Sequence, residues 1–230
     1  MTRIRAGIHI RLGREAQCAV VTQGTRQSGA SLDVLEIDTP HGPARAHVNK
    51  VRGATGGLVL GHGAGGGVGA RDLTAAADAA AATGFSVALV EQPYRVAGRR
   101  SPAPARQLDA ALSAVVAKLR AGPLRRLPLV TGGRSAGARV ACRTAADTGA
   151  VGVLCLAFPL HPPGRPESSR LEELDGVQVP VLVVQGKSDP FGMPPAGPGR
   201  MVVVVPGNHS LTGDLEAVRT AVAEWLAQVR

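Results

Sequence analysis

The sequence is poor in aromatic residues, since tryptophan, tyrosine and phenylalanine together make up 2% of its 230 residues. Proteins that bind nucleic acids stack bases on aromatic side chains, and few are available here. The net charge of +9, by contrast, could favour binding to nucleic acids. Five arginines against Glu15 place +4 of this charge in residues 1–30 and leave +5 for the rest of the chain. We therefore expect no nucleic-acid partner.

Long apolar runs are also missing. No stretch approaches the roughly 18 to 20 consecutive apolar residues that a membrane helix requires. Arginines interrupt every apolar stretch of residues 1–14, so the continuous hydrophobic segment of a secretory signal is absent there. These features predict a soluble protein in the cytoplasm, with no membrane partner.

Cysteine is scarce, with Cys18, Cys142 and Cys155 as the three examples. An odd number at wide spacing gives neither a disulfide framework nor the ligand spacing of a zinc site. Two of the three lie inside apolar patterns. We therefore expect buried, reduced thiols and no metal.

The part of the chain that carries clear patterns begins near residue 31. Residues 1–30 show neither helical nor strand periodicity and predict a poorly ordered basic extension or a weak extra strand. Residues 31–230 are expected to form one domain, because about 200 residues suffice for a single core. Apolar positions in residues 32–36, a turn at Pro40–Pro43 and a second run at Ala44–Val48 predict an antiparallel hairpin.

From Gly57 onward, short apolar runs alternate with alanine-rich helical segments. This alternation is typical of an α/β fold, in which parallel strands are linked by right-handed helical crossovers and helices cover both faces of a twisted sheet. The expected strands are compact apolar runs at Leu58–Leu60, Ser86–Val90, Pro128–Thr131, Gly152–Phe158, Val181–Val184 and Met201–Val205. The expected helices are Asp72–Thr83, Arg106–Arg120, Ala136–Thr148, Pro166–Leu174 and Thr212–Gln228.

A possible nucleophile lies between the strand that ends near Thr131 and the helix that begins at Ala136. Residues Gly133–Gly137 fit the pattern G-x-S-x-G, with Ser135 at its centre. Such a turn exposes the serine hydroxyl, and both flanking positions need glycine because a Cβ there would strike neighbouring backbone. The helix start also aims free N–H groups at a developing oxyanion. By itself, the motif could be a chance match in a chain with 30 glycines.

An acid and a base follow in the order that this chemistry uses. Asp189 comes after the strand Val181–Val184, and His209 comes after Met201–Val205. Carboxyl ends of parallel strands meet at one edge of a sheet, so both side chains should lie near Ser135. His209 would accept the serine proton, and Asp189 would hold the tautomer of the ring. Taken singly, Asp189 could instead cap a turn and His209 could merely begin the last helix.

A glycine-rich loop, residues 62–67, follows the first parallel strand and matches the type that supplies a second oxyanion N–H. Ala64 is the expected donor, with Gly63 and Gly65 as near neighbours. His62 is expected to pack structurally and not to titrate. Together with the N–H of Ala136, the loop would form an oxyanion hole.

The same loop supports a rival interpretation. Gly61, Gly63 and Gly66 fit the dinucleotide fingerprint G-x-G-x-x-G, and Glu91 at the end of the next strand could bind a ribose. A dinucleotide-binding oxidoreductase leaves Ser135, Asp189 and His209 unexplained. We keep it as the weaker alternative.

Several motifs together resemble one family. They are Leu58–Gly67, Glu91–Tyr94, Gly132–Gly137, Phe158–Pro166, Gln185–Gly192 and His209–Leu211. Over about Ser31 to the C-terminus the chain resembles the small α/β hydrolases without a cap domain, which are related to dienelactone hydrolases and to the testis-expressed and non-specific-lethal-complex hydrolase-like proteins. The resemblance implies the α/β-hydrolase fold.

The resemblance also implies roles for particular residues. Ser135, Asp189 and His209 fall on the catalytic positions of the family. Ala64 and Ala136 fall on its oxyanion positions, and Ala136 stands where a methionine is expected after the serine. The substrate-binding residues expected beside them are Gly63, Gly65, Tyr94 and Phe191.

The sequence therefore predicts a serine hydrolase that acts through an acyl-enzyme on a small ester, thioester or lactone, without a metal or organic cofactor. The short segment at 159–179, where larger relatives carry a lid, predicts an open site and a short acyl group. A non-catalytic interaction module that keeps the fold and the triad is the alternative from another class. The oligomeric state and the identity of the substrate stay open.

Overall fold

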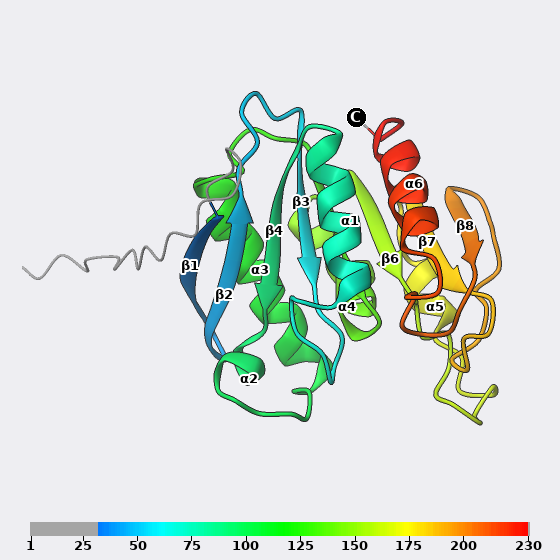
Figure 1. Cartoon of the computed structure of the whole chain (residues 1–230). Helices are drawn as coiled ribbons and strands as arrows, with labels where there is room; N and C mark the ends of the chain where they lie inside the picture. Colours follow the sequence, from blue (N-terminus) through cyan, green and yellow to red (C-terminus); the bar gives the residue numbers. More distant parts are fainter. Residues whose placement is uncertain (1–31, 230) are drawn as a thin grey trace, which may run out of the picture.

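The computed structural model describes residues 32–229 (Figure 1). The predictions for residues 1–30 and for Cys18 lie outside the described residues. The helices and strands follow in the order β1 (Leu32–Thr39), β2 (Gly42–Asn49), β3 (Gly56–Gly61), α1 (Arg71–Ala82), β4 (Phe85–Glu91), α2 (Pro93–Val96), α3 (Ala105–Ala121), β5 (Leu129–Arg134), α4 (Ala136–Thr148), β6 (Gly152–Leu156), α5 (Leu171–Asp175), β7 (Val181–Gly186), β8 (Arg200–Val205) and α6 (Leu215–Leu226).

The strands form one eight-stranded sheet in the order β1-β2-β4-β3-β5-β6-β7-β8. β2 pairs antiparallel with both β1 and β4, and every pair from β4 to β8 is parallel. The predicted antiparallel hairpin and the predicted parallel sheet are therefore confirmed. The chain first builds outward from β3 to β4 and then returns to the other side of β3, so the direction of winding switches between β3 and β5. Open α/β sheets bind their ligands at such a switch point.

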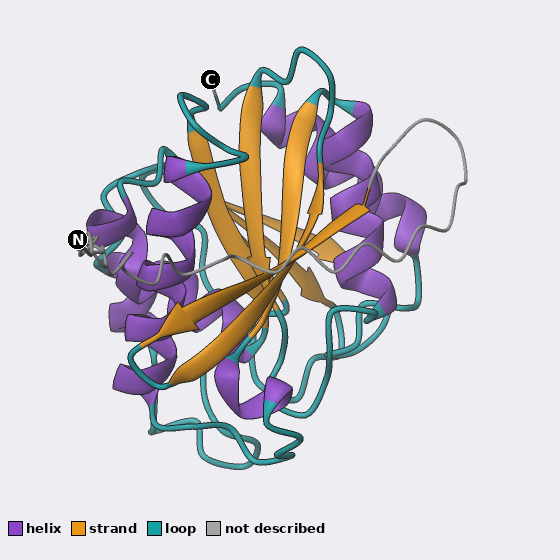
Figure 2. Ribbon diagram, turned by 90° about the vertical axis from the view of Figure 1, so that its left-hand side faces the viewer, coloured by secondary structure: helices purple, strands orange, loops and turns teal. Residues whose placement is uncertain are grey.

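Helices cover both faces of the sheet, as Figure 2 shows. α1 and α6 pack together on one face, and α3 and α4 pack together on the other (Figure 1). The alternation of side chains along β3 serves both layers. Leu58 and Leu60 lie in a core cluster with Leu73 of α1, whereas Val59 lies in a cluster with Leu112 of α3. Each fully buried side chain of this size contributes about 1.5–3 kcal/mol to folding.

The ends of two helices differ from the sequence-based expectation by several residues, and those of α1 and α3 by one. α6 begins at Leu215 and not at Thr212, because the Asp214 carboxylate caps it by accepting the Ala217 N–H at 2.9 Å. The helix expected over Pro166–Leu174 shrinks to the five residues of α5, since its first half forms turns. Proline and serine in that half favour turns over a continuous helix. The short helix α2 was not predicted.

Two of the three cysteines can be placed. Cys142 and Cys155 are buried free thiols with their sulfur atoms 3.5 Å apart, as expected. The hydrogen bond with Cys142, followed by burial, raises the pKa of Cys155 well above its usual value. Among residues 32–229, the helices are all too short or too polar to cross a membrane.

Candidate active site

Ser135 lies on the sharp turn between β5 and α4, beside the switch point. Its backbone has φ 53° and ψ −109°, outside the regions that residues with a side chain favour. The Ser135 N–H donates to the Leu156 carbonyl at 2.9 Å, which ties the strained residue to β6. The turn leaves Ser135 half-buried at the carboxyl edge of the sheet.

The glycines on either side of Ser135 leave no room for a methyl group. A Cβ at Gly133 would lie 2.8 Å from the carbonyl carbon of Gly137, and one at Gly137 would lie 2.6 Å from the carbonyl carbon of Gly61. Both distances are below the 3.0 Å that real Cβ atoms respect, and backbone stands in the way. The expected steric need for glycine at these positions is confirmed.

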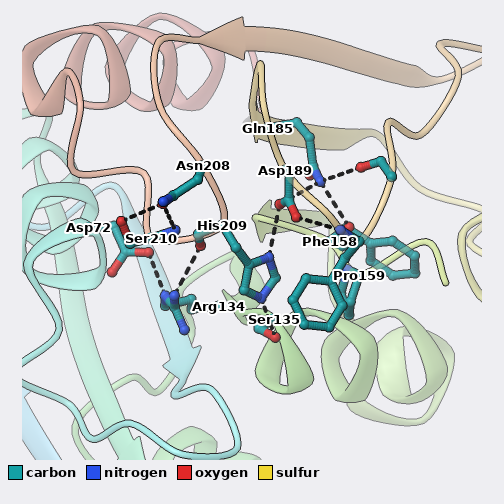
Figure 3. Close-up of polar contacts among 12 residues, drawn as sticks. Asp72, Arg134, Ser135, Phe158, Pro159, Gln185, Asp189, Asn208, His209 and Ser210 are labelled. Atoms are coloured by element: carbon teal, nitrogen blue, oxygen red, sulfur yellow. Dashed lines mark hydrogen bonds and ion pairs between the residues drawn. The ribbon is translucent and has the colours of Figure 1, made fainter. Parts of the chain in front are cut away.

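The structure brings Ser135, His209 and Asp189 together (Figure 3). His209 Nε2 lies 2.9 Å from the Ser135 hydroxyl, and His209 Nδ1 lies 2.8 Å from Asp189 Oδ2. Asp189 follows β7 and His209 follows β8, so three separate loops supply the three side chains. The Asp189 side chain is fully buried, while 17% of the His209 side chain is exposed. This geometry lets the imidazole take a proton from the hydroxyl while the carboxylate accepts the other ring N–H.

Asp189 is itself held in place by two groups besides His209. Its Oδ1 accepts the Phe191 N–H at 2.9 Å, so the turn-capping role considered from the sequence also exists. Its Oδ2 accepts from Gln185 Nε2 at 2.9 Å, and the same amide donates to the Phe158 and Gly192 carbonyls. Gln185 was not identified from the sequence. Its one signal is a polar residue at the end of an apolar, fully buried strand.

Tyr94 and Phe191, which were expected to bind substrate, contact parts of the site itself. The Tyr94 hydroxyl donates to the Ala64 carbonyl at 2.9 Å, and the residue is 6% exposed. The Phe191 ring packs on the His209 imidazole with centroids 4.1 Å apart. These contacts place Tyr94 beneath the glycine loop and Phe191 against the imidazole.

The two expected oxyanion donors lie on either side of the switch point. Ala64 is in the loop that follows β3, and among residues 32–229 its N–H has no hydrogen-bond acceptor. Ala136 is the first residue of α4, where an N–H has no intrahelical partner. Gly63 is buried and packs against Arg134, whereas Gly65 is exposed with open space around its Cα.

His62 is buried and hydrogen-bonded on both ring nitrogens. Nδ1 lies 2.8 Å from the Gly63 carbonyl, and Nε2 lies 3.1 Å from the Gln92 N–H. The carbonyl needs a donor and the N–H needs an acceptor, so the ring is neutral with its proton on Nδ1. Burial lowers the pKa of His62 below its usual 6.5, which agrees with the expected structural role.

A second charged group lies close to the triad and was not identified from the sequence. Arg134 Nε donates to Asp72 Oδ2 at 2.8 Å, and Arg134 Nη2 donates to the His209 carbonyl at 2.9 Å (Figure 3). Burial raises the pKa of Asp72, while the charge of Arg134 and its hydrogen bond, together with the Leu73 N–H, act in the opposite direction. Asp72 resembled an ordinary acid in the first turn of a helix, so the sequence offered no clear signal.

The hollow beside the nucleophile turn is small. It lies between Ala136 and Val140 of α4, Leu108 and Leu112 of α3, and Gln92, with space for about one water molecule. Within the part of the chain that the structure describes, no three His, Cys, Asp or Glu side chains gather into a metal-binding group.

Comparison with known families identifies the class of this protein. The model of the alpha/beta hydrolase domain family matches residues 54–214, and the chain belongs to that family. The predicted fold class is thereby confirmed. A comparison with curated proteins gave no match.

Solved structures agree on the fold. The chain is similar to XC6422 of Xanthomonas campestris, described as an α/β serine hydrolase without a lid, with 22% identity, a TM-score of 0.68, and coverage of 90% of this chain and 97% of that one. It is similar to a dienelactone hydrolase of Anabaena variabilis at 19% identity and a TM-score of 0.68, covering 87% and 98%. It is also similar to the Pyrococcus furiosus esterase Pf2001 at 14% identity and a TM-score of 0.71, covering 90% and 96%.

These comparisons bear on the alternatives raised from the sequence. The family match supports a hydrolase over a dinucleotide-binding oxidoreductase. Glu91, which that rival assigned to a ribose, lies 3.3 Å from His47 Nε2 on the neighbouring strand. The resemblance to dienelactone hydrolases is supported by a structural neighbour. The resemblance to the testis-expressed and lethal-complex proteins stays a prediction.

Proposed function

We propose that the protein is a serine hydrolase that cleaves a small ester, thioester or lactone through an acyl-enzyme at Ser135. The observation that carries the proposal is the unbroken chain of hydrogen bonds from the Ser135 hydroxyl through His209 to Asp189. The alpha/beta hydrolase family and the esterases among its structural neighbours support a hydrolase in general. Ester specificity and the acyl-enzyme are the further steps of the proposal.

In the first half of the reaction, the Ser135 oxygen attacks the carbonyl carbon of the substrate. His209 Nε2 takes the hydroxyl proton as the new C–O bond forms, and Asp189 stabilises the imidazolium. When the tetrahedral intermediate collapses, the bond to the leaving group breaks and His209 returns the proton to it. In the second half, water replaces the serine: His209 removes a proton from water, the acyl group leaves as an acid, and the serine regains its proton.

The negative charge on the tetrahedral oxygen needs donors that are in place before the reaction. The N–H groups of Ala64 and Ala136 are the proposed donors, since Ala64 lies in the loop after β3 and Ala136 at the start of α4, on either side of the switch point. Removing one such donor typically costs a factor of about 10²–10³ in kcat. The bond from Tyr94 to the Ala64 carbonyl supports a fixed loop orientation.

A short acyl group fits the site best. The segment between β6 and β7, where larger hydrolases carry a lid, contains the five-residue helix α5 and loops. The hollow beside Ala136 has space for about one water molecule, so a long acyl chain finds no buried cleft there. Acetyl and similarly small acyl groups are therefore the proposed class.

The test is turnover of p-nitrophenyl acetate by the wild type and three variants. We expect Ser135→Ala and His209→Ala to lower kcat by at least about 10³-fold, and Asp189→Asn by a similar factor, because the three side chains act as a unit. Ser168→Ala is the control, since Ser168 is exposed and its N–H bonds the Arg165 carbonyl and no residue of the triad. Full turnover by Ser135→Ala would overturn the proposal.

The alternative, a non-catalytic interaction module, makes the opposite prediction. A wild-type protein that neither turns over esters of any chain length nor reacts with a fluorophosphonate would favour it. The strained backbone of Ser135 argues against this alternative, because strain of about 1–3 kcal/mol is usually retained where it serves a site.

A further inference from the structure

Proton transfer from Ser135 depends on where the His209 imidazole sits, and two sets of contacts fix that position. Asp189 and the Phe191 ring hold the imidazole itself. The backbone of His209 is held separately, because Arg134 Nη2 donates to the His209 carbonyl at 2.9 Å. Arg134 is the residue directly before the nucleophile, so one side chain links the serine turn to the histidine loop (Figure 3).

The Arg134 guanidinium is fixed in turn by contacts that leave it little freedom. Its Nε donates to Asp72 Oδ2 at 2.8 Å, and Asp72 Oδ1 accepts the Leu73 N–H at 2.9 Å. The Asp72 side chain is 2% exposed and that of Arg134 is 19% exposed. A Cβ at Gly63 would lie 2.8 Å from Arg134 Nη1, so the guanidinium also packs against the glycine loop. Four segments of the site meet at this one group.

A contribution to folding stability does not by itself explain the buried ion pair of Arg134 and Asp72. Burying two charges costs free energy that their attraction often fails to offset, and apolar replacements of similar volume are frequently neutral or stabilising. α4 offers a comparison in Arg143, which makes a bidentate bond to Asp109 of α3 at 2.7 and 2.9 Å. The Arg143 pair also links helices but is less buried, since its two side chains are 21% and 24% exposed, and among the described residues its hydrogen bonds reach no segment of the site. The contact with His209 is what distinguishes Arg134.

We propose that Arg134 and Asp72 are positioning residues for the proposed hydrolysis. Arg134 fixes the backbone of His209 so that the imidazole stays within reach of the Ser135 hydroxyl, and Asp72 fixes the guanidinium of Arg134. Neither residue touches the substrate. The inference rests on the proposed function for its kinetic consequences, but the position of His209 can be measured without turnover.

The main test uses a double variant, Asp72→Leu with Arg134→Met. Removing Arg134 alone leaves a buried carboxylate without its partner, and that variant could simply fail to fold. The double variant replaces the pair by apolar groups and is expected to keep a Tm close to that of the wild type. Arg134→Lys and Asp72→Asn test partial retention of the contacts. Arg143→Met is the matched control on α4.

Kinetics with p-nitrophenyl acetate separate positioning from stability. In the double variant we expect kcat to fall about 10- to 100-fold, the size of effect that a small misplacement of a catalytic group produces, with KM changed less than about twofold. Arg134→Lys should lose less, because one ammonium can still reach Asp72 or the His209 carbonyl. Arg143→Met should lower Tm and leave kcat unchanged. A double variant with wild-type kcat would overturn the proposal.

Proton NMR supplies a readout that needs no substrate. The ring N–H that His209 shares with Asp189 should give a low-field signal in the wild type. We expect this signal to broaden or vanish in the double variant and to persist in Arg143→Met. If the wild type turns over no ester, the proposed hydrolysis fails while this signal still judges the positioning. An unchanged signal in the folded double variant would overturn the proposal in either case.

Discussion

Glycines occur in two parts of the site for different physical reasons. At the nucleophile turn, Gly133 and Gly137 stand where backbone from β3 approaches too closely for any side chain. In the loop after β3, Gly65 and Gly67 have nothing within 4 Å of where a Cβ would be. The two groups look alike as glycine-rich motifs in the sequence. The first is required by packing, whereas nothing in the packing around the second excludes a side chain.

The difference shows where the site is rigid and where it can adjust. Close backbone contact between β3 and the start of α4 fixes the distance between the nucleophile turn and the glycine loop. The open glycines lie at the exposed side of that loop, beyond the Tyr94 bond to Ala64. We therefore expect substitutions at the two groups to differ strongly in their effect on the free energy of unfolding.

The largest effect is expected for Gly137→Ala. The new methyl group would lie 2.6 Å from the carbonyl carbon of Gly61 and 2.9 Å from the carbonyl oxygen of His62, and neither strand nor helix can move cheaply. We expect a loss of at least about 3 kcal/mol in the free energy of unfolding, or no folded protein. Urea denaturation followed by circular dichroism measures it. A loss below about 1 kcal/mol would show that the turn is not packed as described.

Gly186→Ala extends the comparison to a close contact outside the two glycine-rich motifs. Gly186 ends β7, and a Cβ there would lie 2.8 Å from the carbonyl carbon of Asn208, the residue before His209. We expect a destabilisation of about 1–3 kcal/mol together with lower turnover of p-nitrophenyl acetate, because the histidine loop must move. Denaturation and kinetics on the same preparation report both effects. Unchanged kinetics would mean that the loop accommodates the methyl group without shifting His209.

Gly63→Ala should fall between the two groups. Its methyl group would meet Arg134 Nη1 at 2.8 Å, and the end of a long side chain moves more easily than backbone. We expect about 1 kcal/mol of destabilisation, with a drop in kcat that exceeds what this loss of stability explains. The drop follows if the displaced guanidinium loosens its bond to the His209 carbonyl. Thermal unfolding and kcat, compared with Gly66→Ala as control, test this.

The smallest effect is expected for Gly65→Ala and Gly67→Ala. Open space surrounds both Cα atoms and neither has a positive φ, so alanine fits without strain. A smaller unfolded-state entropy should leave stability unchanged or raise it by about 0.4–1 kcal/mol. Differential scanning calorimetry is sensitive enough to show it. Destabilisation by 2 kcal/mol or more would remove the distinction between the two groups of glycines.

The sequence predicted the elements and residues that depend on order along the chain. Alternating apolar runs predicted the parallel strands, and the order of Ser135, Asp189 and His209 predicted that they meet, because strand ends share one edge of a sheet. The residues that hold the triad in place could not be predicted from the sequence. Arg134 meets Asp72 and His209 only through the folded chain, and Gln185 resembles a stray polar residue in an apolar strand. Such contacts have no fixed spacing in sequence.

Two differences between the sequence-based expectation and the structure depend on the local conformation of loops. The segment Pro166–Leu174 has acidic and apolar residues that suit a helix, but proline and serine at its start favour the turns that the structure contains. Tyr94 was expected to bind substrate, and that role stays a prediction. What the sequence did not indicate is that its hydroxyl donates to the Ala64 carbonyl. A loop conformation decides this, and the sequence pattern does not encode it.

The central claim is that the Ser135 hydroxyl becomes a nucleophile because His209 removes its proton. Mass spectrometry after reaction with a fluorophosphonate tests it directly, since trypsin releases Ser135–Arg139 as a separate peptide. We predict one adduct, on Ser135, formed by the wild type and lost in His209→Ala. An adduct on another serine, or labelling of His209→Ala at the wild-type rate, would contradict the claim.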